Sequence, residues 1–315
     1  MSVLPIQTPE NVSRVKTRGV FRYPGGKTWF TPSLLQFLNR HPPSLFVEPF
    51  AGGGALSAAV LDKTSAKIWL NELDSAVVAV HRMVFSARAP RLAQRILDFE
   101  LTLDRVQREL ALTPKTELDL AFQTILRNRV NRGGILAPGA GLVRRGEKGK
   151  GLAQRWYPQT LANRIAELAA HRHRVTVTQG DALAILARTP FRAGTAIFVD
   201  PPCAAGIKSA GRRLYTHHDL DHARLFDVCA ELTVPWVMTH EHDPEVMGLA
   251  WAKGLRWRTV KMTSGHNVTA RELVIGRTLE WADDCSGIDV CEPPVQPTLF
   301  GPAVPLPSRP VRRAP

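Results

Sequence analysis

The chain has 315 residues, 44% of them hydrophobic, so a large folded core is possible and a globally disordered protein is excluded. Its 41 Lys and Arg against 28 Asp and Glu leave a formal charge of +13. That excess favours a polyanionic partner such as nucleic acid, although a surface simply rich in arginine would produce the same number.

The composition also excludes a membrane span and a zinc site. No run of about 18 apolar residues occurs, and the amino terminus has no apolar signal segment. The cysteines form no CxxC pair, and the closely spaced histidines match no zinc pattern. We therefore expect a cytoplasmic protein without a bound metal and without membrane contact.

The first half of the chain begins with strand and helix patterns and then turns helical. Residues 1–19 are polar and predict a flexible arm. The apolar run 45–47 predicts a strand, 55–61 a helix, and 68–70 a second strand. Apolar positions then recur with helical spacing over 76–127, and the following segment, rich in Gly, Arg, Asn and Lys, predicts a basic loop.

Strand patterns return in the second half. They occur at 175–177, 196–199, 235–238 and 272–275. Alternating strands and helices predict an α/β fold with a doubly wound sheet. We divide the chain into an arm at 1–19, one α/β domain made of 20–75 and 171–281, an inserted, mostly helical lobe at 76–170, and a Pro-rich tail at 282–315.

A glycine cluster follows the first predicted strand, in the run Glu48-Pro49-Phe50-Ala51-Gly52-Gly53-Gly54. Glycines between a strand and a helix let the backbone turn sharply and lie close to a ligand. The second strand ends at Glu72, where a carboxylate can bond both hydroxyls of a ribose. Together they indicate a cofactor that contains adenosine. NAD is the competing interpretation, but Ser57 stands where its fingerprint needs a third glycine.

Asp200-Pro201-Pro202 follows the predicted strand at 196–199. Proline fixes φ and has no N–H, so such a turn presents a carboxylate and a carbonyl on a rigid backbone. These two acceptors can take both hydrogens of an exocyclic amine and direct the nitrogen lone pair towards a methyl donor, a reaction that depends mainly on alignment. An ordinary Asx-Pro turn is the alternative.

In this order the motifs resemble those of the Dam-type DNA N6-adenine methyltransferases over roughly residues 20–278. The resemblance implies a Rossmann-like, S-adenosylmethionine-dependent methyltransferase sheet with an inserted DNA-recognition lobe, acting on double-stranded DNA. By resemblance the catalytic motif is Asp200, Pro201, Pro202 and Cys203. The cofactor-binding residues are Tyr23, Lys27, Glu48, Phe50, Gly52, Gly54, Glu72 and Asp181. The DNA-binding residues are Lys27, Arg127, Asn128, Arg129, Asn131 and Arg132.

Cys203 departs from this family, which usually has tyrosine there to stack on the extruded base. Stacking contributes roughly 1–3 kcal/mol per base, and cysteine cannot supply it. Either another aromatic side chain, Tyr215 or Trp29, forms the platform, or the target base differs. Cytosine N4 and RNA therefore remain alternatives to adenine N6, and a nucleic-acid-binding module without catalysis remains an alternative from another class.

The Pro-rich tail carries Gln296-Pro297-Thr298-Leu299-Phe300, which resembles the short peptide by which bacterial DNA-processing proteins dock on the replication sliding clamp. Leu299 and Phe300 would fill an apolar pocket, and Gln296 would fix the register. Short motifs recur by chance, so a coincidental pentapeptide is the alternative. We expect the clamp as a possible second partner.

Overall fold

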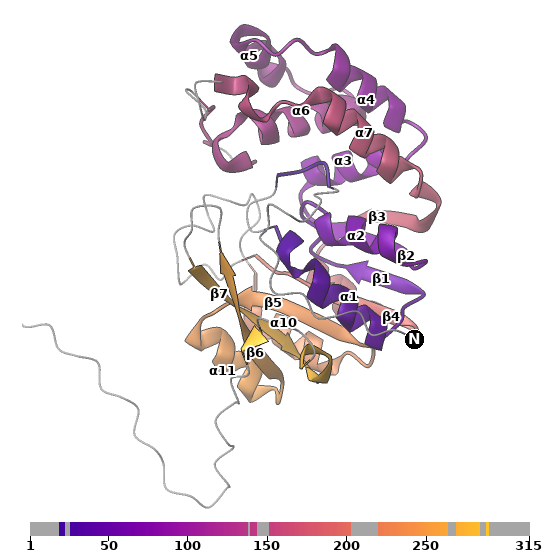
Figure 1. Ribbon diagram of the computed structural model, residues 1–315, viewed down its shortest axis with the longest axis vertical. Coiled ribbons are helices and arrows are strands. Elements are labelled where there is room, and N and C mark those ends of the chain that lie inside the picture. Colours follow the sequence, from indigo (N-terminus) through magenta and orange to yellow (C-terminus); the bar gives the residue numbers. More distant parts are fainter. Residues whose placement is uncertain are drawn as a thin grey trace, which may run out of the picture.

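The computed structural model describes residues 19–22, 26–137, 139–143, 151–202, 220–263, 269–283 and 288–289 (Figure 1). Residues 1–18 of the predicted arm, residues 144–150 within the predicted basic loop segment 128–160, Tyr23, Cys203, Tyr215 and the clamp-like peptide lie outside these residues. No helix in the described ranges is long and apolar enough to cross a membrane.

The described strands form one sheet in the order β3-β2-β1-β4-β5-β7-β6-β8. Strands β1 to β5 run parallel, whereas β7 pairs antiparallel with both β5 and β6. Their bounds are β1 Leu45–Glu48, β2 Lys67–Glu72, β3 Val175–Gln179, β4 Thr195–Val199, β5 Trp236–Glu241, β6 Arg256–Thr263, β7 Thr269–Gly276 and β8 Ile288–Asp289. The Rossmann-like α/β fold expected from the sequence is confirmed.

Both faces of the sheet are covered, because its central strands are apolar on both sides. In β4, Ala196 and Phe198 point into one core, and Ile197 and Val199 point into the other. The first core includes α1 (Thr31–Arg40), α2 (Ala55–Lys63) and α3 (Ser75–Val84). The second includes α8 (Ala182–Arg188), α10 (His222–Glu231) and α11 (Pro244–Ala252). The result is a three-layer arrangement.

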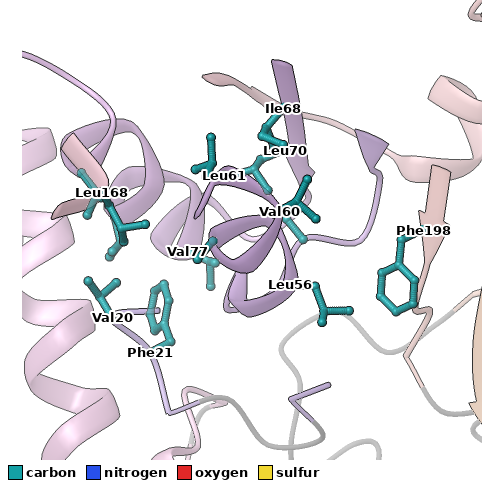
Figure 2. Close-up of a cluster of buried hydrophobic side chains, with 14 of the residues drawn as sticks. Val20, Phe21, Leu56, Val60, Leu61, Ile68, Leu70, Val77, Leu168 and Phe198 are labelled. Atoms are coloured by element: carbon teal, nitrogen blue, oxygen red, sulfur yellow. The ribbon is translucent and has the colours of Figure 1, made fainter. Parts of the chain in front are cut away.

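The first core is continuous from the sheet to the helices beyond it. Figure 2 shows Val60 and Leu61 of α2 beside Ile68 and Leu70 of β2. The same cluster reaches the helices that follow α3, which lie together at the top of Figure 1. These are α4 (Ala89–Asp98), α5 (Leu103–Ala111), α6 (Glu117–Val130) and α7 (Pro158–Ala169).

Regular structure between Ser75 and Ala169 is helical wherever the structure describes it, with short 3-10 turns at Arg132–Gly134 and Gly151–Arg155. Helix α3, which the predicted boundary places almost wholly in the lobe, packs on β2 and β3 and also on α6. The lobe therefore shares its core with the sheet, and the division at 76–170 stays a prediction.

Candidate active site

The candidate site lies where the carboxyl ends of the parallel strands meet. Strand β1 has β2 on one side and β4 on the other, so the chain order reverses at this strand. Ligands of open α/β sheets bind outside the carboxyl ends at such a reversal. The glycine loop follows β1, Glu72 ends β2 and Asp200 follows β4, so the fold brings these three motifs to one edge.

The glycine loop has a backbone that only glycine adopts readily. Gly52 has φ +46° and Gly54 has φ +62°, and Gly54 caps the amino end of α2. A Cβ on Gly54 would lie 2.9 Å from Cε1 of His81 in α3. His81 Nε2 donates to the Gly52 carbonyl at 2.8 Å, and burial lowers the pKa of His81, which favours the neutral ring. The histidine thus fixes the loop against α3.

Glu72 is already bonded to backbone. Its Oε2 accepts from Gly52 N at 2.8 Å, and its Oε1 accepts from Leu73 N at 2.8 Å and Asp74 N at 3.0 Å. A carboxylate offers about four acceptor sites, so three are in use and one, on Oε2, is left. The sequence led us to expect Glu72 to take two ribose hydroxyls, whereas this arrangement leaves room for one.

Asn71, which the sequence analysis did not single out, ties three strand ends together. Its Nδ2 donates to the Pro49 carbonyl at 3.0 Å and to the Gly180 carbonyl at 2.9 Å. Its Oδ1 accepts from Thr178 Oγ1 at 3.0 Å. A fully buried asparagine needs such hydrogen-bond partners. The sequence offered one signal for this role, because Asn71 is a polar residue directly after the apolar strand predicted at 68–70.

Glu48 is buried at the end of β1. Its Oε2 accepts a hydrogen bond from the Ser57 hydroxyl in α2. Burial raises the pKa of Glu48 to about 8, against the lowering effect of that hydrogen bond. The carboxyl is therefore mostly protonated at neutral pH in the absence of a cation. Ser57, the residue that argued against an NAD fingerprint, has a specific partner here.

Asp200 is held by its neighbours through one oxygen. Oδ1 lies 3.0 Å from Lys27 Nζ and accepts from Thr239 Oγ1 of β5 at 2.8 Å. Lys27 also lies 3.5 Å from Glu272 Oε2 of β7. Both of these contacts use Oδ1, so Oδ2 is not engaged by either Lys27 or Thr239. Pro201 is buried and Pro202 half-buried behind it.

The remaining predicted residues lie around this edge. Phe50 is half-buried against the second core, and the Asp181 side chain accepts from Leu183 N, capping α8. Trp29 is half-buried beside Phe30, and its indole N–H has no partner in the described part of the chain. Lys27, predicted to reach cofactor and DNA, is instead engaged with Asp200 and Glu272 in this structure.

A comparison with solved structures matches the chain to proteins that are described as methyltransferases. A proposed RNA methyltransferase of Pyrococcus horikoshii is 12% identical, with a TM-score of 0.37, over 87% of this chain and 91% of that chain. A proposed methyltransferase of Escherichia coli is 13% identical, with a TM-score of 0.35, over 87% and 92%. A proposed methylase of Haemophilus influenzae is 12% identical, with a TM-score of 0.32, over 78% and 87%. No family model and no curated protein matches the chain.

Three of the six predicted DNA-binding residues are buried in the helical lobe. Asn128 is fully buried and clamps the backbone of Arg22, accepting from its N–H and donating to its carbonyl, each at 2.8 Å. Asn131 donates to the Ile135 carbonyl at 2.8 Å. Arg129 is buried at the end of α6 and donates to the Val20 carbonyl. These contacts give the three side chains a structural role, and their contact with DNA stays a prediction.

Arg127 is half-buried, with Nη2 3.5 Å from the Leu110 carbonyl, whereas Arg132 is exposed. Arg132 is therefore the cleanest probe of a DNA surface in this segment. Its backbone N–H bonds the Gly141 carbonyl, a contact that survives removal of the side chain.

We expect Arg132→Ala and Arg129→Met to separate binding from stability. Arg132→Ala should weaken DNA binding and reduce the slope of log K against log salt by about one, with little change in thermal stability. Arg129→Met should lower stability by roughly 1–3 kcal/mol, because the Val20 carbonyl loses its donor. Titration of labelled duplex at several salt concentrations, beside thermal melts, measures both. An unchanged salt slope for Arg132→Ala would remove it from the DNA surface.

Proposed function

We propose that this chain is an S-adenosylmethionine-dependent DNA methyltransferase that modifies the exocyclic amine of a base turned out of the helix, adenine N6. The observation that carries the proposal is the anchoring of Asp200 Oδ1 by Lys27 and Thr239, beside the reversal point of the sheet, which supports a role for Oδ2 as the acceptor of an amine hydrogen. The sheet order, with the reversed strand β7 between β5 and β6, is that of the Rossmann-like methyltransferase fold.

The residues of the loop fit the cofactor. The positive φ of Gly52 and Gly54 gives the loop its tight turn between β1 and α2, Glu72 keeps one acceptor site for a ribose hydroxyl, and Glu48 is a buried acid that a nearby cation would ionise. When bound, S-adenosylmethionine supplies an electrophilic methyl group on a sulfonium. A nicotinamide dinucleotide fits less well, because Ser57 fills the third-glycine position and bonds Glu48.

The chain's own part in the reaction is alignment and charge. Asp200 Oδ2 accepts one amine hydrogen and a carbonyl of the Asp-Pro-Pro turn accepts the other, so that the nitrogen lone pair points towards the methyl group. The proline ring at position 201 fixes the turn, and Lys27 and Thr239 prevent the carboxylate from rotating away. The positive charge that develops on the nitrogen is stabilised by the Asp200 carboxylate.

The net charge of +13 supports a nucleic acid as substrate, and Arg132 is an exposed cation in the predicted recognition segment. The cysteine at position 203, in place of the family's tyrosine, is the observation that favours a second candidate, the same transfer to cytosine N4.

The proposal predicts transfer of label from methyl-tritiated S-adenosylmethionine to duplex DNA, recovered as N6-methyladenine after digestion to nucleosides. Matched reactions with single-stranded DNA and RNA test the substrate class, and recovery of N4-methylcytosine would select the second candidate. Label recovered only from RNA would overturn the DNA assignment. Binding of DNA with no transfer to any of these substrates would indicate a module without catalysis.

A further inference from the structure

One buried carboxyl group beside the candidate site is not used by the reaction as described above. Glu272 lies in β7, two strands from Asp200, with only 16% of its side chain exposed. Its Oε2 is 3.5 Å from Lys27 Nζ, the same ammonium that lies 3.0 Å from Asp200 Oδ1. The Lys27 side chain is 11% exposed, so two carboxyl groups, those of Asp200 and Glu272, share one largely buried ammonium.

Resting on the proposed function, we propose that Glu272 is a positioning residue for methyl transfer: it draws the Lys27 ammonium away from Asp200 when it is ionised, and thereby leaves Asp200 the stronger hydrogen-bond acceptor for the amine. When Glu272 is protonated, it no longer draws the ammonium away from Asp200, and the carboxylate that faces the amine loses negative charge density. Methyl transfer would then have one rate when Glu272 is ionised and a lower rate when Glu272 is protonated.

The groups around Glu272 bring its ionisation close to neutral pH. Burial raises the pKa of Glu272 to about 7; Lys27 opposes this shift, whereas the carboxylates of Asp200 and Glu241 add to it. Glu241 is the β5 residue paired with Glu272 across the strands, and on β6 the paired residue is the apolar Val260. His240, next to Glu241, stays neutral, because burial lowers its pKa to about 3. Arg271 precedes Glu272 on its own strand.

No atom is transferred through Glu272 in this scheme. The amine lone pair forms the N–C bond as the C–S bond breaks and its electrons pass to sulfur. The surplus proton on nitrogen then leaves through Asp200 to water. Glu272 acts only by the position and charge of Lys27, so its ionisation should change the rate of transfer and not the affinity for the cofactor.

The test is a single-turnover pH profile with saturating DNA and cofactor, in the wild type and Glu272→Gln. A glutamine keeps an oxygen for Lys27 but cannot ionise, so the variant should show the wild type's low-pH rate at every pH. The ratio of wild-type to variant rate should be near one at pH 5.5 and rise to about 10 at pH 8.5, with its midpoint near 7. Glu272→Asp, which keeps the charge, should restore a pH-dependent ratio.

Glu241→Gln is the matched control, because it removes the neighbouring carboxylate that is paired with Glu272 across the strands and adds to the raised pKa of Glu272. Because Glu241 raises the pKa of Glu272, the pH profile of Glu241→Gln should keep its shape but have its midpoint at a lower pH than the wild type. A constant wild-type to Glu272→Gln ratio at all pH values would indicate a purely structural residue and overturn the inference. Weaker cofactor binding by Glu272→Gln in calorimetry would overturn it as well.

A second readout does not depend on activity. The pKa of Glu272 is raised from 4.5 to about 7 in the folded state, so its contribution to stability is full below about 4.5 and is lost as pH rises through 7. The melting temperature of Glu272→Gln minus that of the wild type should therefore grow between pH 5 and pH 7.5. If the wild type transfers no methyl group, the proposed function fails while this readout still reports the ionisation. If the wild type transfers methyl groups and Glu272→Gln has the same pH profile, the proposed function stands and only the role of Glu272 fails.

Discussion

Asp200→Asn is expected to reduce methyl transfer by roughly 10²- to 10³-fold while leaving cofactor affinity near that of the wild type. An amide has one acceptor oxygen and one donor nitrogen. Lys27 and Thr239 both require an acceptor, so they would hold the amide oxygen where Oδ1 now lies. The amide nitrogen would then face the amine of the base, donor against donor, and the substrate could not be aligned.

Thr239→Val is the matched control for this variant. It removes one of the two contacts on Oδ1 but keeps the carboxylate and its ion pair with Lys27, so we expect a smaller loss than for Asp200→Asn. Rates come from single turnovers with labelled cofactor, and affinity comes from calorimetry with the demethylated product, S-adenosylhomocysteine. Near-normal turnover by Asp200→Asn would contradict the proposed mechanism.

The central parallel strands could be predicted because β1, β4 and β5 are short apolar runs that are buried on both faces. Residues 196–199 show this most clearly, and they form the centre of β4. The half-exposed edge strand β3 could be predicted from its β-branched residues Val175, Thr176 and Val177. Strand β6 was missed, since Arg256 and Arg258 interrupt its apolar positions and it is defined by pairing with β7 along its whole length. Helix α1 was missed although Leu34, Phe37 and Leu38 have helical spacing and are buried.

That Glu72 and Asp200 lie at one edge of the sheet could be predicted for a related reason. Glu72 and Asp200 each follow a predicted strand, and parallel strands bring their carboxyl ends to one edge. Their partners could not be found in this way. Thr239 and Glu272 lie within strands, and their contacts with Asp200 and Lys27 join segments far apart in the chain. Local spacing carries no information about such pairs.

Arg129 shows a signal that was present but outweighed by composition. Phe122, Ile125 and Leu126 are buried on one face of α6, and position 129 continues that face by helical spacing. The many arginines and asparagines of this segment led to the prediction of DNA binding, whereas the helical spacing of its apolar residues predicts that Arg129 is buried. Arg132 follows the end of the helix and escapes that face, which is why it is exposed.

Glu72→Ala is expected to weaken cofactor binding by more than the loss of one hydrogen bond to the ribose, because the side chain also holds the protein backbone around the site. It holds the glycine loop through Gly52 N–H and the end of β2 through Leu73 and Asp74 N–H. Losing a bonded carboxylate costs roughly 1–3 kcal/mol, or about 5- to 150-fold in Kd, before any loosening of the loop is added. Asp181→Ala should cost less, since among the described residues the Asp181 side chain bonds one backbone N–H, at the cap of α8, and Glu72 bonds three. Calorimetry with S-adenosylhomocysteine measures both.

The acceptor count of Glu72 makes a sharper test possible. With three of about four sites in use, only one ribose hydroxyl can bond the carboxylate directly. Of the 2′-deoxy and 3′-deoxy analogues of S-adenosylhomocysteine, the wild type should therefore bind one about 10-fold more weakly than the parent and the other nearly as well. In Glu72→Ala the parent and both analogues should bind alike. Equal losses for the two analogues in the wild type would mean that Glu72 gives up a backbone contact when the cofactor binds. A loss that persists in Glu72→Ala would assign the ribose to another residue.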